Sequence, residues 1–273
     1  MSIASRLMQT ESPWNPKVIL GRMVARILPT ATLHSFKRHY YAYLLRHERQ
    51  EWAERDQVVV GHLIAPGDVV IDIGASIGGY TKYLSTRVGT QGCVYSFEPN
   101  PEIFDFLSHN VKILKLSNVE IFNVAISDRA GSAQLSIPRY RWGSECHYDA
   151  TLENTADSRC RSVSVPTATL DSLLGDKNIS FIKCDVNYHE LPCLLGAKSL
   201  LERCNPGMLI EIFPDPDTPT TTAYQAFALM QGMGYQAYWF DGTKLRLRLG
   251  GEKSQNYFFL TAKHLPRLAQ FGV

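Results

Sequence analysis

Residues 67–81 read GDVVIDIGASIGGYT. The first part, VVIDI at 69–73, is a short apolar run rich in β-branched residues, which predicts a strand buried on both faces. Glycines that follow such a run, here Gly74 and Gly78, let a strand turn tightly into a helix and let a ligand approach the backbone. The stretch therefore predicts the first strand–turn–helix unit of an α/β protein, with a ligand site at the end of the strand.

Similar apolar runs recur along the chain and alternate with helical patterns. Further strands are predicted at 93–97, 119–124, 179–184 and 208–212, and helices at 79–88, 101–114, 167–175 and 191–203. Alternation of this kind is typical of a parallel, doubly wound sheet.

The C-terminal part breaks the parallel pattern. A helix at about 219–233 is followed by strands at 236–240 and 256–262. The link between these two strands is too short for a crossover helix, so we expect them to be antiparallel.

Residues 1–56 are basic and aromatic, and we assign them to an N-terminal helical extension, with residues 57–273 as the main domain. Apolar residues at helical spacing form two stripes there: Val18, Ile19, Met23, Ile27 and Leu28, then Phe36, Tyr40, Tyr41, Leu44 and Leu45. We expect two helices packed on the main domain. A homodimer contact through these helices and a membrane-surface anchor are the alternatives.

Composition sets limits on location and partners. The net charge of +2 gives no electrostatic case for a nucleic-acid partner. The six cysteines show no metal-binding spacing, which favours reduced thiols. No apolar run is long enough for a transmembrane segment, and the N-terminus lacks the apolar core of a signal peptide. We therefore expect a soluble, cytoplasmic protein.

Two carboxylates accompany the glycine turn. Asp72 precedes the first glycine, and Glu98 follows the second strand in FEPN (97–100), where a carboxylate can accept both hydroxyls of a ribose. The order DxGxxxG differs from the GxGxxG of dinucleotide folds, because an acid at this place repels phosphate but suits a cation. S-adenosylmethionine carries a sulfonium and an amino group and no phosphate. The combination therefore favours a class I methyltransferase over a nicotinamide-dependent oxidoreductase.

The chain resembles the FkbM-type methyltransferases over roughly residues 57–262. The segments that carry the resemblance are GDVVIDIGASIGGYT (67–81), YSFEPNPEIFDFLSHN (95–110), NVEIFNVAISDRAG (118–131), VPTATLDSLL (165–174), ISFIKCDVNYHEL (179–191), LLGAKSLLE (194–202), MLIEI (208–212), GYQAY (234–238) and NYFFL (256–260). The resemblance implies a seven-stranded, Rossmann-like sheet with a reversed last strand. It also implies S-adenosylmethionine as the methyl donor and a hydroxyl, of a sugar, glycan or small natural product, as the usual acceptor.

The resemblance also assigns cofactor-binding residues. The turn residues Gly74, Ala75, Ser76 and Gly78 would wrap the methionine part, and Glu98 would hold the ribose. Asn123 and Val124, after the third strand, would flank the adenine. Asp72 belongs to the same cofactor end of the sheet.

Polar side chains at 185–190 follow the fourth predicted strand, FIKC. Ligands of open α/β sheets bind beyond the carboxyl ends of the strands, so this group should face the same crevice as Asp72. A hydroxyl acceptor benefits from a base, and the ordinary pKa of His189 suits that task. Asp185 would orient the imidazole, position the hydroxyl or bind the amino group of the cofactor. The catalytic candidates are Asp185, His189 and Glu190.

The sequence departs from the family here. The usual text is close to DVEG, then one residue, then Glu, whereas Asn187 replaces a carboxylate and Tyr188 a glycine. Either the base role has moved to His189, or the protein is weakly active or a non-catalytic module that binds the cofactor. His189 as a capping or packing residue is a further alternative, as is a less favoured Mg²⁺ site built from Asp185, Asn187 and Glu211.

The polar segment 139–161 has no clear period. Its arginines and aromatic residues would suit a lid over a carbohydrate acceptor, and the alternative is an exposed loop in which they have no function. These residues are Arg139, Arg141, Trp142, His147 and Tyr148.

Overall fold

The structure is a computed structural model. It describes residues 30–47, 55–139, 145–152, 160–213, 215–252 and 254–273. The first predicted stripe, Val18 to Leu28, and the loop residues Arg141 and Trp142 lie outside the described residues.

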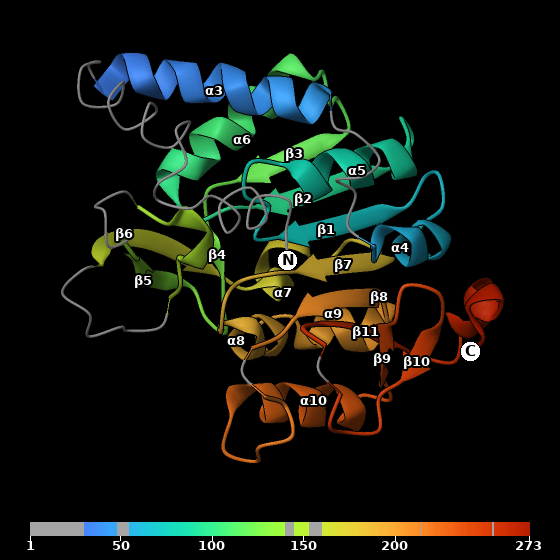
Figure 1. Cartoon of the computed structure of the whole chain (residues 1–273). Helices are drawn as coiled ribbons and strands as arrows, with labels where there is room; N and C mark the ends of the chain where they lie inside the picture. The colour runs from blue at the N-terminus through green and yellow to red at the C-terminus, as the bar shows by residue number, and fades with distance from the viewer. Residues whose placement is uncertain (1–29, 48–54, 140–144, 153–159, 214, 253) are drawn as a thin grey trace.

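An eight-stranded sheet forms the centre of the molecule (Figure 1). Its order is β10-β9-β11-β8-β7-β1-β2-β3. The strands are β1 (Val69–Ile73), β2 (Cys93–Phe97), β3 (Val119–Phe122), β7 (Phe181–Cys184), β8 (Gly207–Glu211), β9 (Gln236–Phe240), β10 (Leu245–Leu247) and β11 (Asn256–Leu260).

Strand direction confirms the expected fold class. Within the run β8-β7-β1-β2-β3 each strand is parallel to the next, and β11 runs antiparallel to both β8 and β9. This is a Rossmann-like doubly wound sheet with a reversed last strand, as in a class I methyltransferase. The eighth strand, β10, is a short antiparallel addition to β9 within the link that the sequence left without structure.

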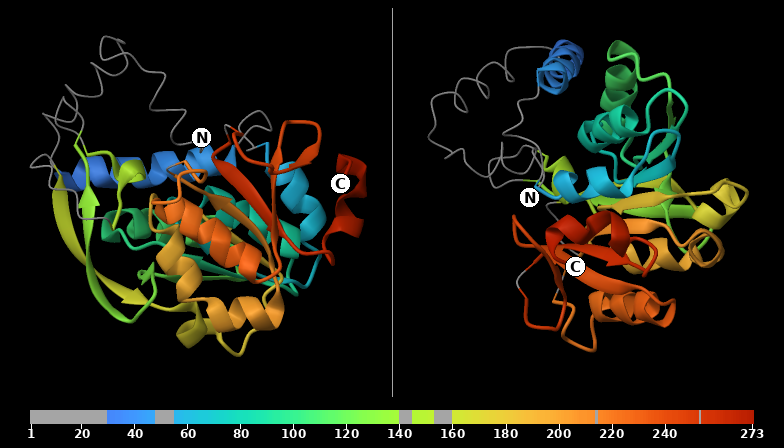
Figure 2. Two further views of the ribbon diagram at one scale, coloured as in Figure 1. Left: turned by 90° about the horizontal axis from the view of Figure 1, so that it is seen from below. Right: turned by 90° about the vertical axis from the view of Figure 1, so that its right-hand side faces the viewer.

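Helices cover both faces of the sheet (Figure 2). Ile71 and Ile73 point to one face, beneath α7 (Leu170–Leu174), α8 (Glu190–Leu195), α9 (Lys198–Cys204) and α10 (Thr222–Gly232). Val70 points to the other, beneath α4 (Gln57–Leu63), α5 (Gly79–Val88) and the 3₁₀ helix η3 (Leu265–Phe271). Burial on both faces explains why the parallel strands read as continuous apolar runs.

The predicted helix at 191–203 is two helices, α8 and α9, separated at Gly196. An ideal Cβ there would lie 1.9 Å from the backbone oxygen of Ser127, so the chain requires a glycine and breaks the helix at this close approach. The predicted helix at 167–175 begins later, at Leu170, because the Thr169 hydroxyl caps it by accepting the Ser172 N–H.

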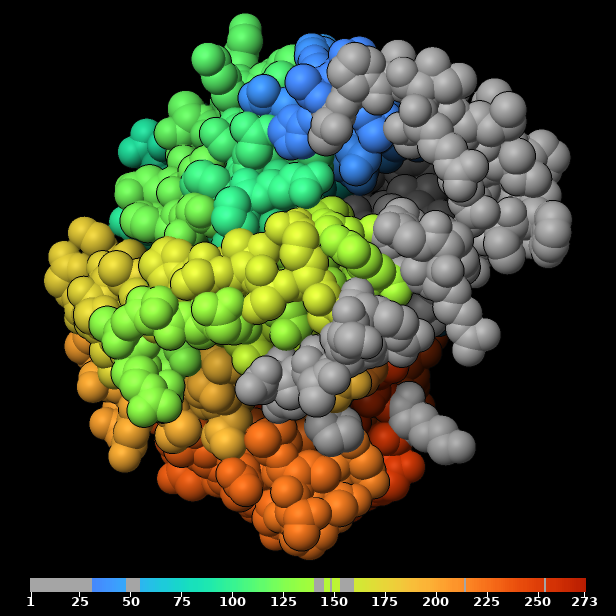
Figure 3. All heavy atoms as spheres, turned by 90° about the vertical axis from the view of Figure 1, so that its left-hand side faces the viewer, coloured from blue at the N-terminus to red at the C-terminus, as the bar shows by residue number. Residues whose placement is uncertain are grey.

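A second, three-stranded sheet was not predicted. Its order is β4-β6-β5, with β4 (Ala125–Ile126), β5 (Gly131–Ile137) and β6 (Arg161–Ala168). These strands carry many polar residues, and their small core depends on Leu135, Ile137 and Val165. The sheet lies on the side of the molecule that faces the viewer in Figure 3.

The helix α3 (Thr30–Arg46) packs on α6 (Pro101–Ile113), where His34 stacks on Phe106 with ring centroids 4.7 Å apart. Tyr41 lies edge-on to the same ring, at 5.2 Å. The predicted packing stripe is wrong for Phe36 and Tyr40, which are 65% and 46% exposed, because the face that packs is rotated toward His34 and Tyr41. None of the helices in the described part of the chain is long and apolar enough to cross a membrane.

Gly74 carries a close contact between two strand ends. Its φ is +79°, and an ideal Cβ would lie 1.8 Å from the backbone oxygen of Asp185. Gly67 has a similar φ of +90° but no atom within 4 Å of such a Cβ, which makes it a matched control. We predict that Gly74→Ala lowers the free energy of unfolding by at least about 3 kcal/mol. Gly67→Ala should lower it by about 1–2 kcal/mol, from φ strain alone. Equal losses in urea denaturation would contradict the contact.

Candidate active site

A polar row crosses the otherwise apolar sheet at Asp72. In the strand register Asp72 lies opposite Ser96 on β2 and Lys183 on β7. The Thr81 hydroxyl on α5 donates to Oδ2 of Asp72 at 2.6 Å. Oδ1 of Asp72 is buried and accepts no hydrogen bond from any described residue. Burial raises the pKa of Asp72, and the charge of Lys183 opposes this.

The turn after β1 is held against the end of β2. The backbone N–H groups of Gly74 and Ala75 both donate to the Phe97 oxygen at 3.0 Å. Ser76 and Gly78 have φ values of +51° and +95°, in the left-handed region that glycine adopts without a steric cost. The turn lies at the carboxyl end of β1, where α5 begins, and its residues Gly74 and Ser76 are partly exposed.

Glu98 is buried beside this turn. Its Oε2 accepts the Ser76 N–H and its Oε1 accepts the Asn100 N–H, each at 2.9 Å. Because a carboxylate oxygen has two acceptor sites, each oxygen keeps one for a further donor. Burial raises the pKa of Glu98 to about 7, and the charges of Asp72 and Asp185 act in the same direction.

Asn123 and Val124 lie behind Glu98. The Asn123 amide donates to the backbone oxygens of Glu98 and Pro99, at 2.8 and 3.0 Å, and so holds the turn after β2. Val124 packs, partly buried, against the main core. Their contact with an adenine stays a prediction.

Asp185 lies between Lys183 and Glu211. Nζ of Lys183 is 3.0 Å from Oδ2 of Asp185, and it also lies over the Tyr80 ring, 5.1 Å from the centroid. Asp185 and Glu211, at the ends of the adjacent strands β7 and β8, share a hydrogen bond. Burial opposes ionisation of Asp185, but Lys183 and the hydrogen bond from Glu211 hold its pKa below the usual value. Burial and the charge of Asp185 raise the pKa of Glu211 to about 8, so Glu211 carries the shared proton at pH 7.

The turn after Asp185 is strained but well held. Asn187 and Tyr188 are left-handed, at φ values of +47° and +72°, so Tyr188 keeps the conformation for which the family uses glycine. The Thr151 hydroxyl donates to the Asn187 oxygen at 2.7 Å, and the Asn187 amide donates to the Ala150 oxygen at 3.2 Å. Buried Glu190 accepts the Tyr188 N–H at 2.9 Å, which is a structural contact within the turn.

His189 faces a different neighbour from the one expected. Its Nε2 lies 3.0 Å from the hydroxyl of Ser127, and burial lowers its pKa against the charge of Asp128. Within the described residues no hydrogen bond or ion pair joins His189 to Asp185. The structure thus groups Asp185 with Lys183 and Glu211.

The sequence interpretation missed Lys183. A lysine inside the apolar run FIKC, in register with an aspartate of the neighbouring strand, was the available signal. The Mg²⁺ alternative at Asp185, Asn187 and Glu211 stays untested. In the described geometry Asp185 and Glu211 are joined by a hydrogen bond. The side-chain amide nitrogen of Asn187 donates to the Ala150 oxygen.

Four carboxyl groups therefore meet at the carboxyl ends of four strands: Asp72, Glu98, Asp185 and Glu211. Among the described residues Lys183 contacts Asp185, and its charge also acts on Asp72 and Glu211. Three of the four have raised pKa values, because burial disfavours their charge. Such a group of carboxyls suits a ligand that brings positive charge and hydrogen-bond donors.

Comparison with known proteins identifies relatives of two kinds. The hexuronic acid methyltransferase AglP of Haloferax volcanii is 28% identical over 167 residues, covering 57% of this chain and 60% of that protein. The ribosomal RNA large subunit methyltransferase E of Legionella pneumophila (strain Lens) is 32% identical over 102 residues, covering 32% of this chain and 50% of that protein. The chain thus spans less than two thirds of the length of these curated relatives.

Solved structures with a similar arrangement include the methyltransferase FkbM from Methylobacillus flagellatus, at 15% identity and a TM-score of 0.46, covering 80% of this chain and 47% of that one. Another is Aeropyrum pernix fibrillarin with bound S-adenosyl-L-methionine, at 12% identity and a TM-score of 0.42, covering 74% and 71%. Because both TM-scores are below 0.5, we base the fold assignment on the strand order of this chain and not on these two structures. The family model described as the methyltransferase FkbM domain matches residues 72–237. Because that match covers more than half of the chain, the protein belongs to the FkbM methyltransferase family.

Proposed function

We propose that the chain is an S-adenosylmethionine-dependent O-methyltransferase that acts on a hydroxyl of a sugar or glycan. The observation that carries the proposal is the group of four carboxyl groups at the carboxyl edge of the sheet, with Lys183 in contact with one of them, Asp185. S-adenosylmethionine brings a sulfonium, an ammonium group and ribose hydroxyls, which are the charges and donors that this crevice accepts.

The residues present fit that cofactor. The two remaining acceptor sites of Glu98 suit the ribose hydroxyls, and the orphaned Oδ1 of Asp72 leaves an acceptor for positive charge. Asn123 and Val124 would lie at the adenine. The methionine part would be held by the turn residues Gly74, Ala75, Ser76 and Gly78. Bound S-adenosylmethionine would supply a methyl group activated by a positively charged sulfur.

The chain's own residues have three tasks in the proposal. Asp185 accepts the proton of the acceptor hydroxyl, because Lys183 holds it ionised and close to the crevice. Glu211 shares its proton with Asp185 and so fixes the orientation of that carboxylate. Glu190 keeps the 187–188 turn in its left-handed conformation. His189 is the second candidate for the base.

The acceptor class is supported by the hexuronic acid methyltransferase relative, which favours a sugar. The second candidate acceptor is RNA, supported by the match to the large-subunit ribosomal RNA methyltransferase. A cofactor-binding module without catalysis is the remaining alternative, motivated by the changed 187–189 stretch.

Asp185→Asn should lower the methyl-transfer rate by roughly 10²–10⁴-fold, the usual contribution of a general base. The measurement is transfer of a labelled methyl group from S-adenosylmethionine to a glucuronic-acid disaccharide, with a large-subunit ribosomal RNA transcript as the second acceptor. Affinity for S-adenosylhomocysteine should stay within about three-fold of the parent value, and His189→Ala should keep most of the rate.

Three outcomes would contradict the proposed base, the proposed acceptor or catalysis itself. Full activity of Asp185→Asn, with loss in His189→Ala, moves the base to His189. Transfer to the RNA alone overturns the sugar acceptor. Cofactor binding without transfer to either probe favours the non-catalytic module.

The shared proton also predicts a pH-dependent stability. Glu211 has a folded-state pKa of about 8, above its usual value of 4.5, so its ionisation destabilises the native state as pH rises through that window. Glu211→Gln removes this penalty and should raise Tm relative to the parent at pH 8.5 but not at pH 4.5. Glu202→Gln, on the exposed side of α9, is the control and should shift Tm little at either pH. A Glu211→Gln protein no more stable than its parent at pH 8.5 would contradict the buried proton.

A further inference from the structure

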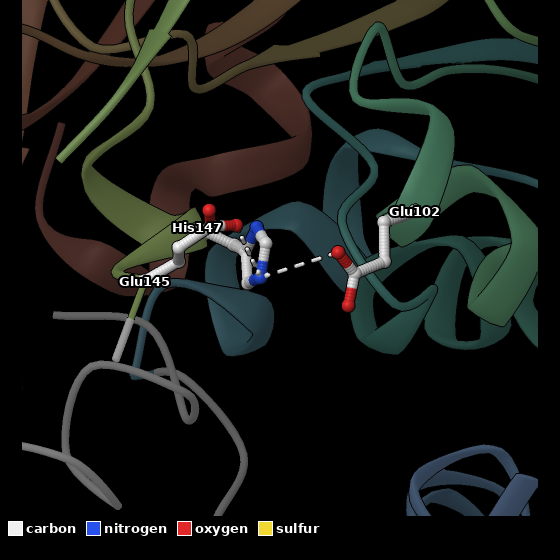
Figure 4. A group of neighbouring side chains, drawn as sticks. All are labelled: Glu102, Glu145 and His147. Atoms are coloured by element: carbon white, nitrogen blue, oxygen red, sulfur yellow. Dashed lines mark ion pairs between the residues drawn. The ribbon is translucent and has the colours of Figure 1, made fainter. Parts of the chain in front are cut away.

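A second polar cluster, formed by Glu102, Glu145 and His147, lies beside Asn100 in the turn after β2 (Figure 4). Their potential ligand atoms all lie within 4.8 Å of one another. Nε2 of His147 is 3.8 Å from a carboxylate oxygen of each glutamate. The figure shows the imidazole between the two carboxylates, one of which comes from the start of α6.

Hydrogen bonding determines which imidazole nitrogen carries the proton. Asn100 caps α6, and its Oδ1 accepts the Glu102 N–H at 3.1 Å, which fixes the orientation of the amide. Its Nδ2 therefore donates to Nδ1 of His147, at 3.2 Å. A neutral imidazole has one donor and one acceptor nitrogen, so Nε2 carries the proton and points to the glutamates.

This arrangement disfavours a metal ion. A metal would need the lone pair of Nε2, which would place the proton on Nδ1, against the donating amide of Asn100. Arg161 already pairs with both oxygens of Glu145, at 2.6 and 2.7 Å, and its charge opposes a second cation. The cluster is balanced by the protein's own groups.

The same segment reaches the other side of the crevice. Residues 145–151, which we call the bridge, begin at Glu145 and His147 beside Asn100. They end at Ala150 and Thr151, which hydrogen-bond to Asn187. Asn100 follows β2 and Asn187 follows β7, and β1 lies between these strands.

The two ends of the bridge lie on opposite sides of β1. Its middle residues, His147–Asp149, form the 3₁₀ helix η2. One end hydrogen-bonds a residue that follows β2, and the other end hydrogen-bonds a residue that follows β7. Because β1 lies between these strands, the bridge spans the strand whose Gly74–Gly78 turn would hold the cofactor.

We propose that the bridge is a wall of the cofactor site and that His147 is its positioning residue, setting the Glu98 carboxylate through Asn100. The path is short: His147 accepts from the Asn100 side chain, and the Asn100 backbone donates to Oε1 of Glu98. The far end of the bridge, at Thr151, holds the acceptor turn instead. This inference rests on the proposed function.

The two ends can be separated by substitution. His147→Ala removes one hydrogen-bond partner and should weaken binding of S-adenosylhomocysteine roughly ten-fold, with a matching rise in KM for S-adenosylmethionine and little change in kcat. His147→Gln keeps an acceptor for Asn100 and a donor for the glutamates, so its affinity should stay within about three-fold of the parent. Thr151→Val should leave this affinity unchanged and raise KM for the acceptor.

Hydrogen exchange of the ligand-free protein gives a second readout. His147→Ala should speed exchange of the Ser76 and Asn100 amides, both of which donate to Glu98, and His147→Gln should not. Unchanged exchange in His147→Ala overturns the inference whether or not the protein binds the cofactor. Failure of the parent to bind S-adenosylhomocysteine, with exchange as expected, sinks the proposed function alone. Loss of affinity after EDTA dialysis, restored by Zn²⁺, would make the cluster a metal site and also overturn the inference.

Discussion

The contact between Lys183 and Asp185 is the constraint on which the site depends. A lysine in a central strand is stable in the sheet because Asp72 lies opposite it in register and Asp185 lies 3.0 Å from its Nζ. One cation does not balance four carboxyl groups, and burial raises the pKa of Glu98 to about 7 and that of Glu211 to about 8. A ligand that carries positive charge would therefore stabilise these carboxyl groups beyond what Lys183 does.

The topology brings these groups together. Each carboxyl group follows or lies within a different parallel strand, and parallel neighbours place their carboxyl ends at one edge. Gly74 allows the turn after β1 to touch the backbone at Asp185, so the turns after β1 and β7 meet without an intervening side chain. The bridge then hydrogen-bonds, at its two ends, Asn100 after β2 and Asn187 after β7.

Strongly apolar and glycine-marked segments could be predicted from the sequence, and weakly patterned ones could not. VVIDIGASIGG and FEPN predicted both the fold and the place of Glu98, because burial and backbone conformation leave few residue choices there. The strands β5 and β6 escaped prediction because GSAQLSI and RSVSVPTA have few apolar residues. The partner of His189 could not be predicted, since Ser127 is 62 residues away in the chain. Tyr188 was seen to replace a glycine, but the sequence could not show that the turn would keep its left-handed backbone.

Isothermal titration of the protein with S-adenosylmethionine at pH 7, in two buffers of different ionisation enthalpy, tests the central claim most directly. A cationic ligand that donates to Glu98 must lower the raised pKa values of the site, so binding should release protons and the measured heat should depend on the buffer. Glu98→Gln should release fewer protons than the parent. Binding whose heat is the same in both buffers, or no binding at all, would contradict a carboxyl-rich site built for a cationic methyl donor.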